Sequence, residues 1–323
     1  MKLAQFKTKG SEQQKLGIAL GDVVCDVAEL ARAVQASEGD PAEWLLNANS
    51  TLEVIRRGAP AIKEIDALIT HGPSSARAQV SSYLLDEIEF LPAVYPQKIL
   101  AIGRNYVDHA IEGGAEPPKA PLIFNKLSNS LSAHTAPIVL PTISSQVDYE
   151  AELAVIIGRN AKRIDAAAAL DYVFGYVPFF DISTRGLVRR THFIGKGQDT
   201  HGCCGPWIIT KDEIPDPHNV VVKSWNNGEP RQNYNTSAMA HKIPDQIAWL
   251  SKFARLSPGD IVATGTFHEG LKPVNSGDTI EIEFENMGRA KFRVIGNSPR
   301  KDVDWLPGRD QPKPPEGGGI HKV

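Results

Sequence analysis

Residues 147–158 read V-D-Y-E-A-E-L-A-V-I-I-G, a segment with the two-residue period of a β-strand that carries acids where a buried strand would carry none. Asp148, Glu150 and Glu152 share one face, and the residues after Glu152 are apolar on both faces, as in a strand entering a core. Side chains two apart on a strand lie roughly 6–7 Å from each other. Two or three carboxylates can therefore converge on one cation, and a hard divalent metal suits them.

The alternative for these acids is a half-exposed strand whose carboxylates face water. The apolar residues that follow argue for a site instead, because carboxylates at the mouth of a buried strand need a partner from elsewhere in the chain. Asp181, which ends the apolar run over 173–180, is our candidate third metal ligand. Its alternative is the N-cap of a helix over 183–190, and the two roles could coexist.

The composition of the chain is that of an ordinary globular protein. It has 323 residues, 41% of them hydrophobic and 23% charged, and a net charge of -3. This balance, without a run of Lys and Arg, argues against nucleic acid as a partner. No apolar run approaches the roughly 18 residues of a membrane span, and the first residues form no signal peptide. Three cysteines, two of them adjacent, form neither a disulfide framework nor a zinc site. We therefore expect a cytoplasmic enzyme or binding protein with no membrane partner.

The sequence divides into three parts by its hydrophobic periodicity and its Pro and Gly content. Residues 1–95 are predicted to form a small N-terminal α/β domain, because a hairpin signal at Gly21-Asp22 precedes helical patterns in 27–36 and 42–57. The proline-containing stretch 91–96 breaks the periodicity and marks the boundary. Residues 96–298 are the predicted catalytic domain, and 299–323 form a tail rich in Pro and Gly. The predicted fold class is α+β, mostly β.

A second candidate group lies in the segment after the first strand of the catalytic domain. His109 and Glu112 are three residues apart, so on one helical turn the carboxylate can orient the imidazole. The alternative is an incidental pair on a surface turn. The Gly and Pro pairs at 113–114 and 117–118 predict a mobile loop suited to a lid.

Cationic residues recur near the ends of the predicted buried strands. Lys126 ends a strand over 121–126, Arg185 comes one turn after Asp181, and Lys196 lies in a glycine-flanked loop. Cations beside a carboxylate-bound metal suit an anionic substrate, whereas Arg185 and Lys196 could each instead be a solvated surface charge. Thr266 ends another strand, in small residues whose backbone can approach a ligand closely.

Six ordered motifs between about residues 98 and 294 together resemble the fumarylacetoacetate hydrolase family. The motifs are G-R-N-Y-x-D-H-x-x-E at 103–112, D-Y-E-A-E-L-A-V-I-I-G at 148–158, G-Y-x-x-F-x-D-I-S-x-R at 175–185, G-K-x-x-D-T at 195–200, N-G-E-x-R-Q at 227–232 and L-x-P-G-D-I-V-A-T-G-T at 256–266. The resemblance implies a mixed β-sandwich roll that is usually a homodimer.

The resemblance also implies roles for individual residues. It implies Mg²⁺ or Mn²⁺, with Ca²⁺ as a substitute in crystals, held by Glu150, Glu152 and Asp181. It implies that His109 and Glu112 are a water-activating dyad on a lid, with Lys196 as a third catalytic residue. The residues predicted to contact a small anionic 2-oxo acid are Asn105, Tyr106, Lys126, Arg185 and Thr266.

Two departures from the family pattern fall where substrate should bind. The family often has Asp and Gln where this chain has Gly186 and Val188. The common T-G-T-P-x-G-V-G is here T-G-T-F-H-E-G-L over 264–271. The metal motif is intact, but the usual substrates of the family are not implied.

Our leading hypothesis is hydrolysis of a carbon–carbon bond in a 1,3-diketo acid, of the acylpyruvate or fumarylacetoacetate type, through a metal-stabilised enolate. His109 would deprotonate the attacking water. The enzymatic alternative is an oxaloacetate decarboxylase or tautomerase, or a dienoate hydratase or isomerase, with the same metal site. A third hypothesis is a catalytically silent binding protein that keeps the fold.

Overall fold

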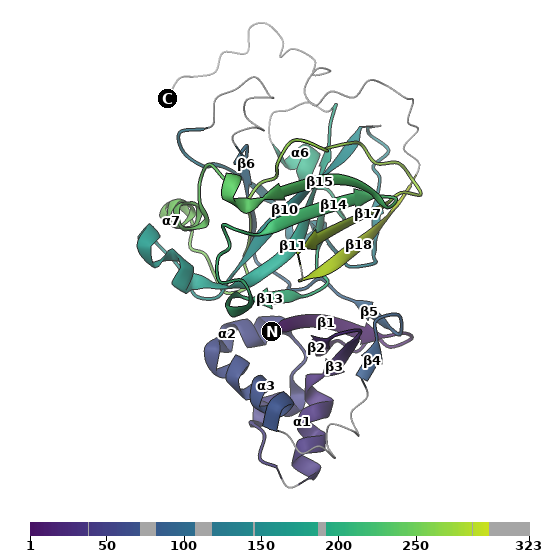
Figure 1. Cartoon of the computed structure of the whole chain (residues 1–323), viewed down its shortest axis with the longest axis vertical. Coiled ribbons are helices and arrows are strands. Elements are labelled where there is room, and N and C mark those ends of the chain that lie inside the picture. The colour runs from purple at the N-terminus through teal and green to yellow at the C-terminus, as the bar shows by residue number, and fades with distance from the viewer. Residues whose placement is uncertain are drawn as a thin grey trace, which may run out of the picture.

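The protein is built on two mixed β-sheets with short helices around them (Figure 1). The computed structural model describes residues 1–37, 39–71, 82–106, 118–144, 146–186, 192–285 and 287–296. Strands dominate the described residues, which confirms the predicted mostly β class.

The larger sheet has 13 strands and carries the acidic segment in its middle. Its strands are β1 (Lys2–Thr8), β2 (Lys15–Leu20), β3 (Val23–Asp26), β4 (Ser82–Leu84), β5 (Ile88–Phe90), β6 (Ile99–Gly103), β7 (Leu122–Lys126), β8 (Leu131–Ala133), β10 (Val147–Ile157), β11 (Val173–Thr184), β12 (Gly202–Cys204), β13 (Ile208–Thr210) and β16 (Ile261–Ala263). The order is β4-β3-β2-β1-β13-β11-β10-β16-β6-β7, and β5, β8 and β12 pair beside this path. The acidic strand β10 is therefore central, with β11 and β16 on its two sides.

The smaller sheet has five strands in the order β15-β14-β17-β18-β9. They are β9 (Pro137–Val139), β14 (Val221–Asn226), β15 (Glu229–Asn235), β17 (Thr279–Phe284) and β18 (Gly288–Ile295). The β14–β15 hairpin turns at Asn227-Gly228, and both residues have positive φ, 52° and 80°. Asn-Gly favours this turn because both residues tolerate the left-handed region.

The described helices are short and lie at the periphery. They are α1 (Val27–Ala36), α2 (Thr51–Arg57), α3 (Ala59–His71), α6 (His192–Lys196) and α7 (Ile243–Phe253), with 3₁₀ segments η1 (Glu43–Asn47), η2 (Ser128–Ser130), η3 (Ala166–Tyr172), η4 (Lys211–Glu213) and η5 (Thr236–Ala238). The predicted helix over 27–36 is confirmed, with the Asp26 carboxylate as its N-cap acceptor. The pattern over 42–57 forms η1 and α2 instead of one continuous helix. None of these helices has the length and apolarity needed to cross a bilayer.

The N-terminal strands extend the larger sheet. Strand β1 pairs with β13, and the ammonium group of Met1 donates to Thr210 Oγ1 over 2.6 Å and to Glu213 Oε1 over 2.7 Å. The hairpin predicted at Gly21-Asp22 is confirmed by the pairing of β2 with β3. Figure 1 shows β1 to β3 and α1 to α3 below the rest of the molecule. The division at residue 95 stays a prediction.

Strand β10 separates two hydrophobic cores by its alternation. Tyr149, Leu153 and Val155 face a core shared with the smaller sheet. On the opposite face, Ala154 and Ile156 pack in a second core with residues of α1, α2 and α3. The face with Ala154 and Ile156 is the face of the acids, so the carboxylates lie where a buried apolar layer would otherwise continue.

His134, a partly buried histidine in the loop after β8, predicts acid sensitivity. Its Nδ1 accepts a hydrogen bond from the backbone N–H of Lys291 over 2.9 Å, and its ring stands edge-on to Phe90. Burial, with a smaller contribution from Lys291, lowers the pKa of His134 to about 4. The unfolded chain, with a histidine pKa of about 6.5, therefore binds a proton here that the folded protein does not. Stability should fall as the pH falls from about 6.5 to about 4.

We expect His134→Asn to flatten this dependence, because Asn Oδ1 can accept the same hydrogen bond without titrating. The free energy of unfolding in urea should lose about 1.4 kcal/mol less per pH unit in the variant, the slope of one proton. Equal slopes for the variant and the wild type between pH 6.5 and 4.5 would contradict the assignment.

Candidate metal centre

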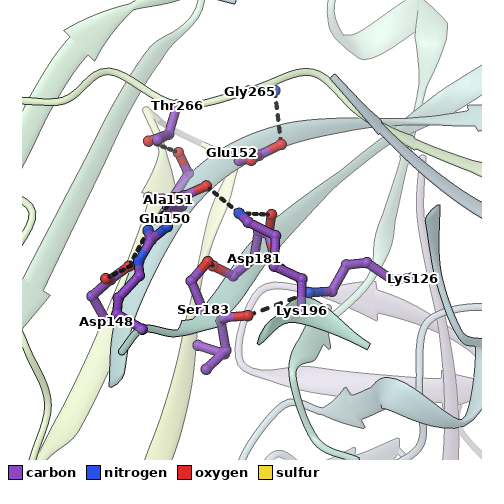
Figure 2. A network of polar contacts seen from close by, with 12 residues as sticks. Lys126, Asp148, Glu150, Ala151, Glu152, Asp181, Ser183, Lys196, Gly265 and Thr266 are labelled. Atoms are coloured by element: carbon purple, nitrogen blue, oxygen red, sulfur yellow. Dashed lines mark hydrogen bonds and ion pairs between the residues drawn. The ribbon is translucent and has the colours of Figure 1, made fainter. Parts of the chain in front are cut away.

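Three carboxylates meet at one place on the larger sheet. Glu150 on β10 lies directly opposite Asp181 on β11, and Glu152 is two residues further along β10. One ligand oxygen from each lies within 4.8 Å of the other two, and all three side chains are buried. Like charges placed directly across a sheet repel each other. The three acids proposed from the sequence are thus brought together in a geometry that calls for a cation (Figure 2).

Two lysines contact Asp181, and one of them also contacts Glu150. Lys196 Nζ donates to Glu150 Oε2 over 2.8 Å and to Asp181 Oδ2 over 2.5 Å. Lys126 Nζ donates to Asp181 Oδ1 and to the carbonyl of Ile182. Burial lowers the pKa of Lys126 despite the carboxylate beside it. For Lys196 burial acts the same way, but Asp181 and Glu150 together raise its pKa. Lys196 is therefore buried and is not the solvated surface charge that was its alternative.

Arg185 is held by an acid outside the cluster of three. Its Nε and Nη2 bind the two oxygens of Asp148 over 2.6 and 2.8 Å, and Nη2 also donates to Glu150 Oε1 over 2.6 Å. A bidentate pair fixes the plane of the guanidinium. Burial raises the pKa of Asp148, and Arg185 opposes that rise. Asp148 therefore holds Arg185, and the guanidinium lies beside the carboxylate cluster.

Glu152 differs from the other two acids of the cluster in its surroundings. Its Oε2 accepts from the backbone N–H of Gly265 over 2.8 Å, and no basic side chain of the described residues bonds to it. Burial, then Asp181 and Glu150, raise the pKa of Glu152 well above its usual range. Gly265 has φ +93°, and a Cβ there would lie 2.9 Å from that of Asn105. Only glycine brings this N–H so close to the carboxylate.

The donor set fits a hard divalent cation. Three carboxylate oxygens are the ligands that Mg²⁺ and Mn²⁺ prefer, and such an ion would place positive charge beside Glu152, which no basic side chain in the described part of the chain contacts by a hydrogen bond. A buried acid is costly without a partner. The alternative of a solvated acidic strand is therefore wrong, because all residues of β10 are buried.

Asn105 and Thr266, two residues predicted to contact substrate, form hydrogen bonds to the backbone. The Asn105 amide donates to the carbonyls of Thr264 and His241, and its Oδ1 accepts from the N–H of His241. Thr266 Oγ1 donates to the carbonyl of Ala151 over 2.7 Å. These contacts tie the loop after β16 to β10 and so place Gly265. Contact of either side chain with substrate stays a prediction.

Tyr106 belongs to an aromatic cluster beside Glu152. Its ring stands edge-on to Tyr234 at 5.1 Å and to Phe267 at 6.3 Å, and Tyr234 stacks on Phe267. Burial raises the pKa of both tyrosines, and the charge of Glu152 adds to this. Phe267 is one of the departures from the family pattern. The cluster gives this side of the site an apolar wall.

Sequence reasoning missed the support that β15 gives to this wall. Gln232 Nε2 donates to Thr266 Oγ1 and to the carbonyl of Phe267, while the Tyr234 hydroxyl donates to the carbonyl of Ala151. Both residues face inward by alternation from the Asn-Gly turn. That alternation was the signal that could have identified them.

The structure differs from the sequence-based expectation in the local surroundings of two site residues, Asp181 and Lys196. Asp181 is not a helix N-cap, because β11 continues past it through Thr184. Lys196 ends the short helix α6 and is not in a loop. The proposed dyad of His109 and Glu112 lies outside the described residues, as does Val188.

Comparison with known proteins identifies the family of this chain. Residues 98–295 match the family model described as fumarylacetoacetate (FAA) hydrolase C-terminal. A mitochondrial oxaloacetate tautomerase of Xenopus laevis is 33% identical over 311 residues, covering 91% of this chain and 90% of the relative. Its counterpart in Rattus norvegicus is 35% identical over 305 residues, covering 91% and 92%. Among solved structures, maleylpyruvate hydrolase from Sphingobium sp. SYK-6, in complex with manganese(II) and pyruvate, has 32% identity and a TM-score of 0.71, covering 92% of this chain and 100% of the other.

Proposed function

Because this chain belongs to the fumarylacetoacetate hydrolase family, we propose that it is a divalent-metal-dependent enzyme that interconverts the enol and keto forms of oxaloacetate. The observation that carries the proposal is the buried cluster of Glu150, Glu152 and Asp181 with basic side chains around it.

The charges of the site favour a small anion once a metal is present. Four carboxylates, including Asp148, surround three cations, so the formal charge is about -1, and a divalent ion changes it to about +1. An anionic 2-oxo acid would neutralise this positive charge, whereas a neutral ligand would leave it uncompensated. The Sphingobium hydrolase was solved in complex with manganese(II) and with pyruvate, a small anionic 2-oxo acid.

The choice of oxaloacetate depends on the relatives that match over the whole chain. Oxaloacetate tautomerases from frog and rat align with about nine-tenths of this protein, including its N-terminal part. Both tautomerases also exceed the 32% identity of the maleylpyruvate hydrolase, which covers a similar share of this chain.

Different side chains would have separate roles in such a reaction. When bound, the cation would supply positive charge beside the 2-oxo oxygen, where negative charge develops as a proton is transferred. Arg185, fixed by Asp148, would hold a substrate carboxylate, and Lys196 would stabilise or protonate an oxygen through Nζ. The aromatic cluster of Tyr106, Tyr234 and Phe267 would keep water from this side of the site.

Hydrolysis of a carbon–carbon bond in an acylpyruvate is the second candidate. It is supported by the resemblance to maleylpyruvate hydrolase over 92% of this chain. Hydrolysis needs an activated water, which we assign to His109 oriented by Glu112. Tautomerisation needs no water as a reactant, so the two candidates differ in their need for this dyad.

Product analysis with both substrates separates the two candidates. With Mn²⁺ present, we expect the wild type to accelerate loss of the ultraviolet absorbance of enol-oxaloacetate and to leave an acylpyruvate intact. His109→Ala should then retain tautomerase activity. Release of pyruvate from an acylpyruvate, abolished by His109→Ala, would favour the hydrolase instead.

A further inference from the structure

The oxygens of Glu150 and Asp181 are divided between different cations. Glu150 Oε1 is bound by Arg185 and Asp181 Oδ1 by Lys126. The remaining oxygens, Glu150 Oε2 and Asp181 Oδ2, are both bound by Lys196 Nζ. One ammonium group thus lies between two of the three proposed ligands and binds one oxygen of each.

We propose that the Lys196 ammonium is an internal counter-ion that occupies the metal position, and that a divalent ion displaces it toward the substrate. The inference rests on the metal site proposed above and adds an exchange of cations within it. Two carboxylate oxygens that converge on an ammonium can converge equally on a metal, but not on both at once. The displaced Nζ becomes free to bind an anionic substrate only in the metal-loaded enzyme.

Lys196 is better suited to move than the other lysine on Asp181. Its side chain is 10% exposed and ends a five-residue helix, with Nζ 4.9 Å from the ring centroid of Phe124. Lys126 is fully enclosed on the sheet and has a second contact with the carbonyl of Ile182. An ammonium on a flexible four-carbon stem can change partners without moving the backbone.

The matched variants Lys196→Met and Lys126→Met test the exchange. Each removes one positive charge adjacent to Asp181 and keeps an unbranched apolar side chain of similar length. The dissociation constant for Mn²⁺ can be measured without substrate by electron paramagnetic resonance of the free ion. Lys196→Met should bind Mn²⁺ about tenfold more tightly than the wild type, or tighter still, because no ammonium competes for the two oxygens. Lys126→Met should show no such gain, because it frees only Asp181 Oδ1 and leaves Lys196 on the two converging oxygens.

Equal tightening in both variants would overturn the proposal, because loss of charge alone would then explain the effect. Weaker binding in Lys196→Met would overturn it too, since the lysine would then support the metal site. A wild type that fails to bind Mn²⁺ would overturn the proposed metal site itself, which separates the failure of that proposal from the failure of this inference.

A measurement on the wild type does not depend on how the variants fold. Reductive methylation of lysines, resolved by mass spectrometry, should be slow at Lys196 without metal and several times faster with saturating Mg²⁺, because its Nζ loses two carboxylate partners. Lys126 should react slowly in both conditions. An unchanged rate at Lys196 would overturn the exchange.

Discussion

Replacement of Glu150 by Gln is expected to lower metal-dependent turnover of oxaloacetate by at least about a thousandfold, equivalent to about 4 kcal/mol of transition-state stabilisation. Gln keeps the shape of the side chain and one oxygen, but removes one of three charges that we assign to the metal. The remaining amide oxygen can bind Arg185 or Lys196, so the fold should persist. Steady-state kinetics with Mn²⁺, beside circular dichroism, measures both effects.

Glu283→Gln is the matched control for this experiment. Glu283 lies on β17 of the smaller sheet, near Arg289 and away from the acidic cluster. Its variant should keep wild-type turnover. Exhaustive chelation of the wild type should reproduce the loss seen with Glu150→Gln, and added Mn²⁺ should restore the wild type alone. Full activity after chelation would contradict a metal-dependent mechanism.

The acidic strand could be predicted from sequence because its pattern is local. The two-residue period over residues 147–157 separates the acids from the tyrosine and aliphatic residues on the other face, and that separation is what the two cores show. Asp181 was identified from another local pattern, an apolar run that ends in an acid. Its position opposite Glu150 was not predicted, because the register of β10 on β11 depends on packing along both strands.

The partners of the acids could not be predicted for a related reason. Nothing local indicates that Asp148 takes Arg185 while Asp181 takes two lysines, since these contacts join residues 15 to 55 positions apart. The strand that continues through Thr184 was also missed, because polar residues after an acid favour a cap in isolation, and pairing with β10 overrides that preference. The homodimer and the cytoplasmic location stay predictions.

The second large effect is expected on stability, from Asp181→Asn. The wild-type carboxylate neutralises Lys126, whose side chain is fully buried. Removing one partner of a buried ion pair leaves an uncompensated charge and typically costs about 3–5 kcal/mol. We expect the free energy of unfolding of the metal-free variant in urea to fall by an amount of that order.

The loss should depend on pH in a defined direction. Burial already lowers the pKa of Lys126, and without Asp181 the pKa should fall further. The unfolded chain, with a lysine pKa of about 10.4, then binds a proton that the folded variant binds less well. The deficit should therefore be larger at pH 6 than at pH 9.

The double variant Asp181→Asn with Lys126→Met identifies the cause. It removes both buried charges, so it should recover most of the lost stability, because similar apolar groups can replace a buried ion pair at little cost. The extra loss of stability at pH 6 relative to pH 9 should also disappear, because no unpaired lysine remains. Lys196 keeps Glu150 as its partner in both variants. Mn²⁺ binding should stay impaired in the double variant, because a ligand is still missing. A double variant as unstable as Asp181→Asn alone would show that the aspartate stabilises β11 by some means other than its pairing with Lys126.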